Sequence, residues 1–176
     1  MEYISERIKR FLNKQTTIDL LIAAREFVGF LERDGQPDEQ FYRNTQKALA
    51  KLYLAGLSFE QIELEYSVSP KDDYSSKKTE LSKNNLDQIS NLGKRCFYWE
   101  VFDPAYDKEN EPTQGWLVDD FCDIYNDLKL ELYKIEKVKT NESIEDALWQ
   151  LHFGFNVHWG IHCINASRAL FFVLNN

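Results

Sequence analysis

The residues best suited to chemistry in this sequence are its three histidines, which all lie between positions 152 and 162. His158 and His162 are four residues apart, so they share one face if this part of the chain is helical. Imidazole binds metal ions and exchanges protons near neutral pH. The pair is therefore the first candidate for a metal, ligand or acid–base site.

A group of aspartates is the second candidate. Asp119, Asp120, Asp123 and Asp127 lie in a segment whose apolar residues recur with helical spacing. On a helical wheel Asp120 and Asp127 fall near the edge of the apolar stripe, whereas Asp119 and Asp123 fall on the far side. We therefore expect Asp120 and Asp127 to reach a neighbouring helix. We expect Asp119 and Asp123 to face solvent or a partner.

The wheel of the last predicted helix places His162 inside the apolar stripe and His158 on its edge. A buried imidazole is expected to have a hydrogen-bond partner, and Asp120 and Asp127 are the first candidates for His162. The favoured interpretation is a core histidine bonded to a carboxylate or a backbone carbonyl. A metal or ligand site completed by Asp120, Asp127 or Glu100 and a His–Asp acid–base pair are the alternatives.

These arguments define a candidate polar or ligand site. Its members are Glu100, Asp120, Asp127, His158 and His162, and all but Glu100 are also the candidate metal ligands. The sequence contains no Walker A pattern, dinucleotide-binding glycine fingerprint, Cys-x-x-Cys pair, His-Glu-x-x-His motif or Gly-x-Ser-x-Gly motif. We therefore expect no cofactor, and a divalent metal ion is the one alternative.

The elements that must position these residues are predicted to be helices. Only 7 glycines and 4 prolines occur in 176 residues, which is below average usage and favours helices over many short strands. The sequence predicts an all-α fold: a single up-and-down bundle of about five to seven helices. The predicted helical segments are residues 3–12, 18–33, about 37–56, 58–66, 86–101, 116–135 and 143–174.

The C-terminal helix is predicted to be the longest and to lie at the centre of the bundle. At 1.5 Å per residue it would extend roughly 45 Å if it were unbroken. Gly154 and Gly160 inside it mark close packing or a kink. The whole chain, residues 1–176, is expected to form one domain, with a polar, mobile connection near residues 67–84 because that segment has few large apolar side chains.

Composition and charge exclude several function classes. The net charge of −8 repels phosphate, so we expect no nucleic-acid partner. The apolar runs are too short for a membrane span, and the N-terminus lacks the apolar stretch of a signal peptide. Three cysteines in apolar helical patterns are typical of a reducing compartment, so we expect a cytoplasmic protein.

Aromatic side chains off the main apolar stripe leave two alternatives open. Phe153, Phe171 and Phe172 lie away from the stripe of the last predicted helix. A helix that is apolar on several faces is central to a bundle, and this interpretation is favoured. The alternative is an exposed aromatic patch that binds a protein partner or a second subunit. The acidic surface is a further candidate for such an interface.

The C-terminal half also carries a recognisable set of short motifs. They are Tyr98-Trp99-Glu100-Val101-Phe102-Asp103-Pro104, Glu111-Pro112, Gly115, Leu117, Asp119-Asp120, Asp123-Ile124-Tyr125, Asp127-Leu128-Lys129, Phe155, His158-Trp159-Gly160, His162 and Arg168-Ala169-Leu170. In this combination, over residues 97–170, the chain resembles a bacterial family called domain of unknown function 5063. The resemblance implies a helical intracellular bacterial protein, and it implies no activity.

The sequence is therefore compatible with three functions. The favoured one is a non-enzymatic interaction or accessory protein that uses its acidic or aromatic surface. The second is a metal-dependent, hydrolase-like enzyme with aspartates and histidines from two helices. The third is a small-ligand binder with a polar pocket around His158 and His162. Whether the protein is an enzyme stays open, and convergence of carboxylates and imidazole nitrogens on one point would favour the metal site.

Overall fold

The computed structural model describes residues 3–33, 35, 38–67, 81–101, 105, 109 and 111–175, apart from the side chain of residue 88. Its elements are α1 (Glu6–Leu12), α2 (Gln15–Leu31), α3 (Glu39–Ser58), α4 (Lys83–Ile89), a 3-10 helix (Ser90–Cys96), β1 (Phe97–Glu100), β2 (Thr113–Trp116), α5 (Leu117–Tyr133), a π-helical turn (Lys134–Val138), α6 (Asn141–Val157) and α7 (Trp159–Asn175). The seven α-helices of the described residues confirm the all-α prediction.

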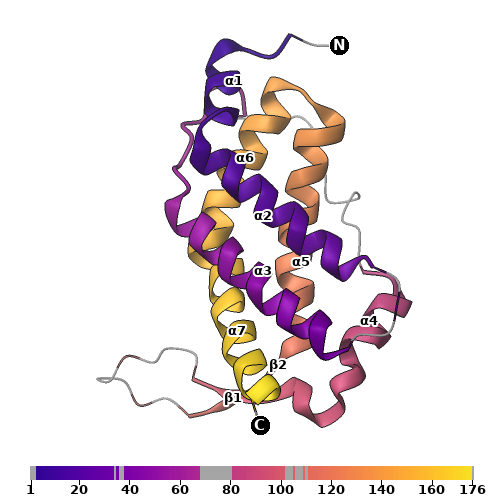
Figure 1. Cartoon of the computed structure of the whole chain (residues 1–176). Helices are drawn as coiled ribbons and strands as arrows, with labels where there is room; N and C mark the ends of the chain where they lie inside the picture. Colours follow the sequence, from indigo (N-terminus) through magenta and orange to yellow (C-terminus); the bar gives the residue numbers. More distant parts are fainter. Residues whose placement is uncertain are drawn as a thin grey trace.

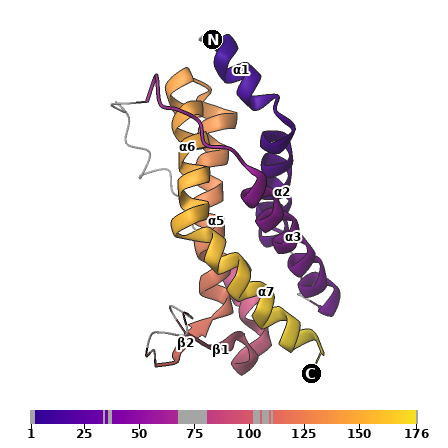
Figure 2. The ribbon, with the colours of Figure 1, turned by 90° about the vertical axis from the view of Figure 1, so that its left-hand side faces the viewer.

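The helices form two antiparallel groups that α7 connects. Figure 1 shows α2 and α3 running in opposite directions, and α5 running opposite to α6 and α7. In Figure 2, α2 and α3 lie on one side, α5 and α6 on the other, and α7 crosses between them. Helix α7 packs against α3, α5 and α6, so the last helix is central, as predicted.

Polar caps at helix starts explain several element boundaries. The Ser5 hydroxyl accepts a hydrogen bond from the Ile8 amide at the start of α1. The Asp38 carboxylate accepts one from the Phe41 amide at the start of α3. At the start of α6, Thr140 and Ser143 cap each other's backbone amides reciprocally. Each cap satisfies an amide that has no partner inside its helix.

The predicted C-terminal helix is two helices with a sharp break at His158. This residue has φ −145° and ψ −86°, outside the helical region. Gly160 permits the break, because a Cβ at this position would lie 2.2 Å from the Phe155 carbonyl oxygen. Trp159 is buried beside the break, and its indole nitrogen donates to the Leu151 carbonyl at 3.3 Å. The two histidines therefore lie at the end of α6 and in the first turns of α7.

The predicted helix over residues 86–101 is wrong in its second half. After α4 and the 3-10 helix, the chain becomes strand β1, which pairs antiparallel with β2 in the register Phe97↔Trp116 to Glu100↔Thr113. Gly93 has φ +58°, a left-handed conformation that interrupts a helix. The aromatic run that follows suits a strand better than a helix.

The segment before the predicted polar connection also differs from expectation. Residues 59–64 are irregular rather than helical, and the chain there is held by side chains of other elements, as described below. Most of the connection, residues 68–80, lies outside the described residues. The described ends are anchored, because Ser67 and Leu81 are buried and α4 already begins at Lys83.

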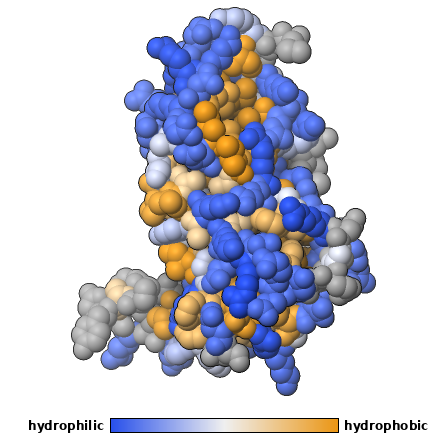
Figure 3. All heavy atoms as spheres, in the orientation of Figure 1, coloured by the Kyte–Doolittle hydropathy of each residue, from blue (hydrophilic) through white to orange (hydrophobic). Residues whose placement is uncertain are grey.

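Hydrophobic side chains also reach the surface. On the face that Figure 3 shows, hydrophobic atoms appear in separate patches among hydrophilic ones. Phe153, Phe171 and Phe172 are 46%, 55% and 54% exposed, so these three lie on the surface rather than in the bundle centre. Within the described residues, no helix combines the length and the apolarity that a membrane crossing requires.

Candidate metal centre

Helix α5 presents three aspartates to the start of α7. Asp120 lies in the first turn of α5 and is buried, and Asp123 and Asp127 follow three and seven residues later and are partly buried. Negative charge in the first turn is favourable at the positive end of the helix dipole. The spacing keeps the three carboxylates on one flank of the helix.

Each of the two histidines is held by one of these carboxylates. His158 Nδ1 lies 2.7 Å from Asp127 Oδ2, and His162 Nδ1 lies 2.8 Å from Asp120 Oδ1. Asp120 is thus one of the two acceptors that the helical wheel predicts for His162, and Asp127 bonds to His158 instead. Because an ionised carboxylate only accepts, a neutral imidazole in this position carries its proton on Nδ1 and its lone pair on Nε2.

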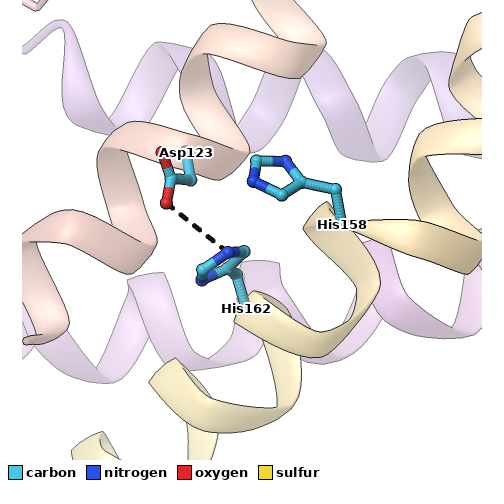
Figure 4. Close-up of side chains that lie close together, drawn as sticks. All are labelled: Asp123, His158 and His162. Atoms are coloured by element: carbon cyan, nitrogen blue, oxygen red, sulfur yellow. Dashed lines mark ion pairs between the residues drawn. The ribbon is translucent and has the colours of Figure 1, made fainter. Parts of the chain in front are cut away.

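The third aspartate faces the histidines directly (Figure 4). Asp123 Oδ2 lies 3.4 Å from His162 Nε2, and the two imidazole rings are 4.9 Å apart at 73°. One ligand atom each from Asp123, His158 and His162 lies within 4.8 Å of the other two. Two ligands that are each about 2.1 Å from a tetrahedral ion are about 3.4 Å apart, so the His162–Asp123 pair already has that spacing.

The electrostatics of this group favour a bound cation or an extra proton. The hydrogen bond to Asp120 raises the pKa of His162, although burial opposes the shift. Burial raises the pKa of Asp123, and the nearby His162 partly offsets this. With the His162 proton on Nδ1, Nε2 and Asp123 Oδ2 are two acceptors facing each other. They repel unless a proton or a metal cation lies between them.

A tyrosine of the hairpin that β1 and β2 form is hydrogen-bonded to Asp120. The Tyr98 hydroxyl donates to Asp120 Oδ2 at 2.6 Å, and burial together with this bond raises the pKa of Tyr98, so the hydroxyl stays protonated. A Cβ on Gly115, the residue paired with Tyr98 in β2, would lie 2.5 Å from the Tyr98 ring. A glycine at this position therefore lets the ring lie across β2 and reach α5.

The structure brings together most, but not all, of the predicted site residues. Asp120, Asp127, His158 and His162 lie in one group, whereas Glu100 accepts a hydrogen bond from Asn165 Nδ2 at 2.6 Å and contacts neither histidine in this way.

The prediction that Asp123 faces solvent or a partner is wrong. This residue shares the flank of Asp120 and Asp127, and its position three and four residues from them could have shown this. We call Asp120, Asp123, Asp127, His158 and His162 the histidine–aspartate cluster.

Comparisons with known proteins agree with the fold. A model of the family described as a domain of unknown function, DUF5063, matches residues 12–176, which extends the similarity well beyond residues 97–170. The solved structure of protein BF1032 from Bacteroides fragilis is similar, with a TM-score of 0.66 and 23% identity over 94% of this chain and 99% of that chain. At this identity the likeness concerns the fold alone. No curated protein matches this chain significantly.

Proposed function

Because this chain belongs to the DUF5063 family, whose description names no activity, we propose a function from the site itself. The protein binds a divalent transition-metal ion through Asp123, His158 and His162. The observation that carries the proposal is the convergence of one ligand atom from each residue to within 4.8 Å of the others. Imidazole and carboxylate are ligands that suit zinc, iron and similar first-row ions.

The surroundings of the histidines support this choice over a purely structural role. In metal centres, a ligating histidine usually donates its second ring N–H to a carboxylate, a backbone carbonyl or a water, which fixes the tautomer and the ring orientation. Both histidines have this partner, Asp127 for His158 and Asp120 for His162. The His158 side chain is 46% exposed and lies at the helix break, so it can move to complete the coordination.

An ion with three protein ligands keeps at least one position open. Such open sites are typical of catalytic rather than structural metal centres, and an ion held by these residues would supply Lewis-acid chemistry. We therefore favour the metal-dependent, hydrolase-like alternative of the sequence analysis over a purely non-enzymatic accessory role.

Thermal unfolding with and without metal tests the proposal, and the third histidine provides a matched control. Zn²⁺, Mn²⁺, Ni²⁺ or Co²⁺ added to metal-free wild type should raise the melting temperature by several degrees, because a ligand that binds the folded state stabilises it. The shift should persist in His152→Ala, whose ring packs near Phe59, and vanish in His158→Ala and His162→Ala. Asp123→Asn, a milder change, should weaken it.

A protein that lacks stoichiometric metal after such an addition, or a shift that survives in His162→Ala, would overturn the metal site. Co²⁺ absorption provides an independent readout, since the ligand field of a Co²⁺ ion bound to imidazole differs from that of the hydrated ion. Folding of each variant is checked by circular dichroism before metal is added.

The remaining parts of the proposal concern location and partners. A cytoplasmic location is supported by the buried free thiols of Cys96 and Cys163, which suit a reducing compartment. The acidic net charge of −8 supports the absence of a nucleic-acid partner. Self-association through exposed Phe171 and Phe172 is a second candidate role, and sedimentation of wild type against Phe171→Ser tests it.

A further inference from the structure

A cleft of 440 Å³ lies between the hairpin and the C-terminal half of α7. One side is formed by the end of the 3-10 helix and by β1, and the other by α7. The lining residues that matter here are Arg95, Phe97, Tyr98, Trp99, Arg168 and Phe172. Two guanidinium groups and several aromatic rings therefore border one open space, in a protein whose net charge is −8.

The arginines supply the positive charge of this cleft. Arg168 is exposed and makes no hydrogen bond or ion pair with any residue that the structure describes. Arg95 donates to the Val173 carbonyl, which anchors its side chain at the edge of the cleft and uses part of its five N–H donors. Guanidinium groups form strong, directional hydrogen bonds to carboxylate and phosphate oxygens.

The aromatic residues supply flat surfaces beside this charge. Trp99 is 68% exposed and Phe172 is 54% exposed. Large aromatic rings gain stability when a second planar group stacks against them, so a ligand ring would cover surface that water now contacts. A cleft with guanidinium donors and exposed rings is complementary to a ligand that has both features.

We propose that this cleft binds a small anion that carries a planar ring. The anionic group contacts the guanidinium groups of Arg168 and Arg95, and the ring lies against Trp99 and Phe172. This inference goes beyond the proposed metal site, but the two are connected. Tyr98 lines the cleft, and its hydroxyl donates to Asp120, the partner of His162. A ligand in the cleft therefore lies beside the residues that orient the metal ligands.

Calorimetric titration of the metal-free protein in EDTA tests the cleft with four probes. AMP combines a ring with a phosphate, benzoate combines a ring with a carboxylate, adenosine has only the ring, and inorganic phosphate has only the anion. We expect AMP or benzoate to bind saturably, at least tenfold more tightly than adenosine or phosphate. The tighter of the two shows which anion the arginines recognise.

Variants decide whether the binding occurs in this cleft. Arg168→Gln should weaken it about tenfold or more, since hydrogen bonds to charged groups are among the strongest in proteins. Trp99→Ala should weaken it as well. Arg25→Gln is the matched control, because Arg25 is a similarly exposed arginine that pairs with Glu136, and it should have no effect.

Either of two calorimetric results would overturn the proposal. One is that no probe binds with a Kd below about 1 mM, and the other is equal affinity in wild type and Arg168→Gln. A stable dimer that leaves no probe bound would also overturn it, in favour of a second copy as the occupant. Because EDTA removes metal from these titrations, a negative result does not contradict the proposed metal site. If the protein binds no metal, the titrations still test ligand binding in the cleft.

Discussion

Two carboxylate-centred groups at different places in the same bundle use their oxygens in opposite ways. The first surrounds Glu145 of α6, whose side chain is fully buried. Its Oε1 accepts from Arg7 at 2.5 Å. Its Oε2 accepts from the backbone amides of Glu65, Tyr66 and Ser67 at 2.6–2.9 Å and from the Ser67 hydroxyl at 3.1 Å. We call this group the Glu145 cluster, and it ties α1 and the irregular segment after α3 to α6.

The histidine–aspartate cluster differs because its acceptors are not all matched by donors. Asp120 and Asp127 have partners, but Asp123 Oδ2 faces His162 Nε2 at 3.4 Å, and part of the cluster is open to solvent. A carboxylate saturated with donors stabilises the fold, whereas acceptors that converge on one another leave room for a cation. The donors around a buried acid therefore indicate its role more than its burial does.

The largest expected effect is the loss of the Glu145 carboxylate. Glu145→Gln should lower the free energy of unfolding by about 3–5 kcal/mol, because Arg7 loses a buried partner and amide hydrogens replace an acceptor. The metal-induced shift in melting temperature should be unchanged. Denaturant unfolding measures the loss, and Glu136→Gln, in an exposed pair with Arg25, is the control. A loss below about 0.5 kcal/mol would show that the Glu145 cluster is not structural.

The second-largest effect is expected for Asp120, which orients a metal ligand and can be tested through metal affinity. Asp120→Asn should weaken metal affinity about 10–100-fold, because His162 loses the carboxylate that fixes its tautomer. Metal titration monitored by Co²⁺ absorption measures it. Asp146→Asn is the control, since Asp146 pairs with Lys134 instead of a histidine. Unchanged affinity in Asp120→Asn would contradict the assignment of Asp120 as the positioning residue of His162.

The two clusters should also differ in the sign of their pH dependence. Burial acts to raise the pKa of Glu145, but Arg7 and the backbone amides outweigh it and hold this pKa below its usual value. The contribution of Glu145 to the free energy of unfolding is therefore present at neutral pH and lost as pH falls below about 4. The bond to Asp120 raises the pKa of His162. Without metal, its contribution is therefore present below about pH 6.5 and lost as pH rises through its folded-state pKa.

Unfolding free energies of the metal-free protein at pH 3 to 9 measure this difference. His162→Gln should remove on the order of 1 kcal/mol of stability at pH 5.5 and less at pH 9. With metal present the trend should reverse, because protons and the ion compete for the same nitrogen, so that affinity rises with pH. The same loss at both pH values would mean that folding does not raise the pKa of His162.

The smallest effect on metal binding is expected from a residue that contacts the metal ligands only through Asp120. Tyr98→Phe removes the hydroxyl that donates to Asp120 and should weaken metal affinity by less than about tenfold. Tyr125→Phe is a matched control, since Tyr125 also donates to a carboxylate, Glu32, at 2.8 Å. It should cost similar stability and leave metal affinity unchanged. Equal metal affinity in both variants would mean that Tyr98 supports only the fold.

Periodicity in the sequence predicted several features that depend on one helix. A helix advances a constant angle per residue, so periodicity placed His162 within the apolar stripe and made Asp120 one of its two candidate acceptors. Low glycine and proline content likewise sufficed for the fold class, and a set of short motifs sufficed for the family.

How these faces meet depends on the packing of the helices. The choice of Asp127 as the partner of His158, the pairing of Glu100 with Asn165 and the hydrogen bond from Tyr98 to Asp120 depend on the rotation and offset of one element against another. The helix break at His158 is accompanied by a close approach of Phe155 to Gly160. The saturation of Glu145 by a distant segment is of the same kind. Contacts between segments far apart in sequence leave no periodic signal in either segment, because each side chain's partner is set by packing rather than by its own helix.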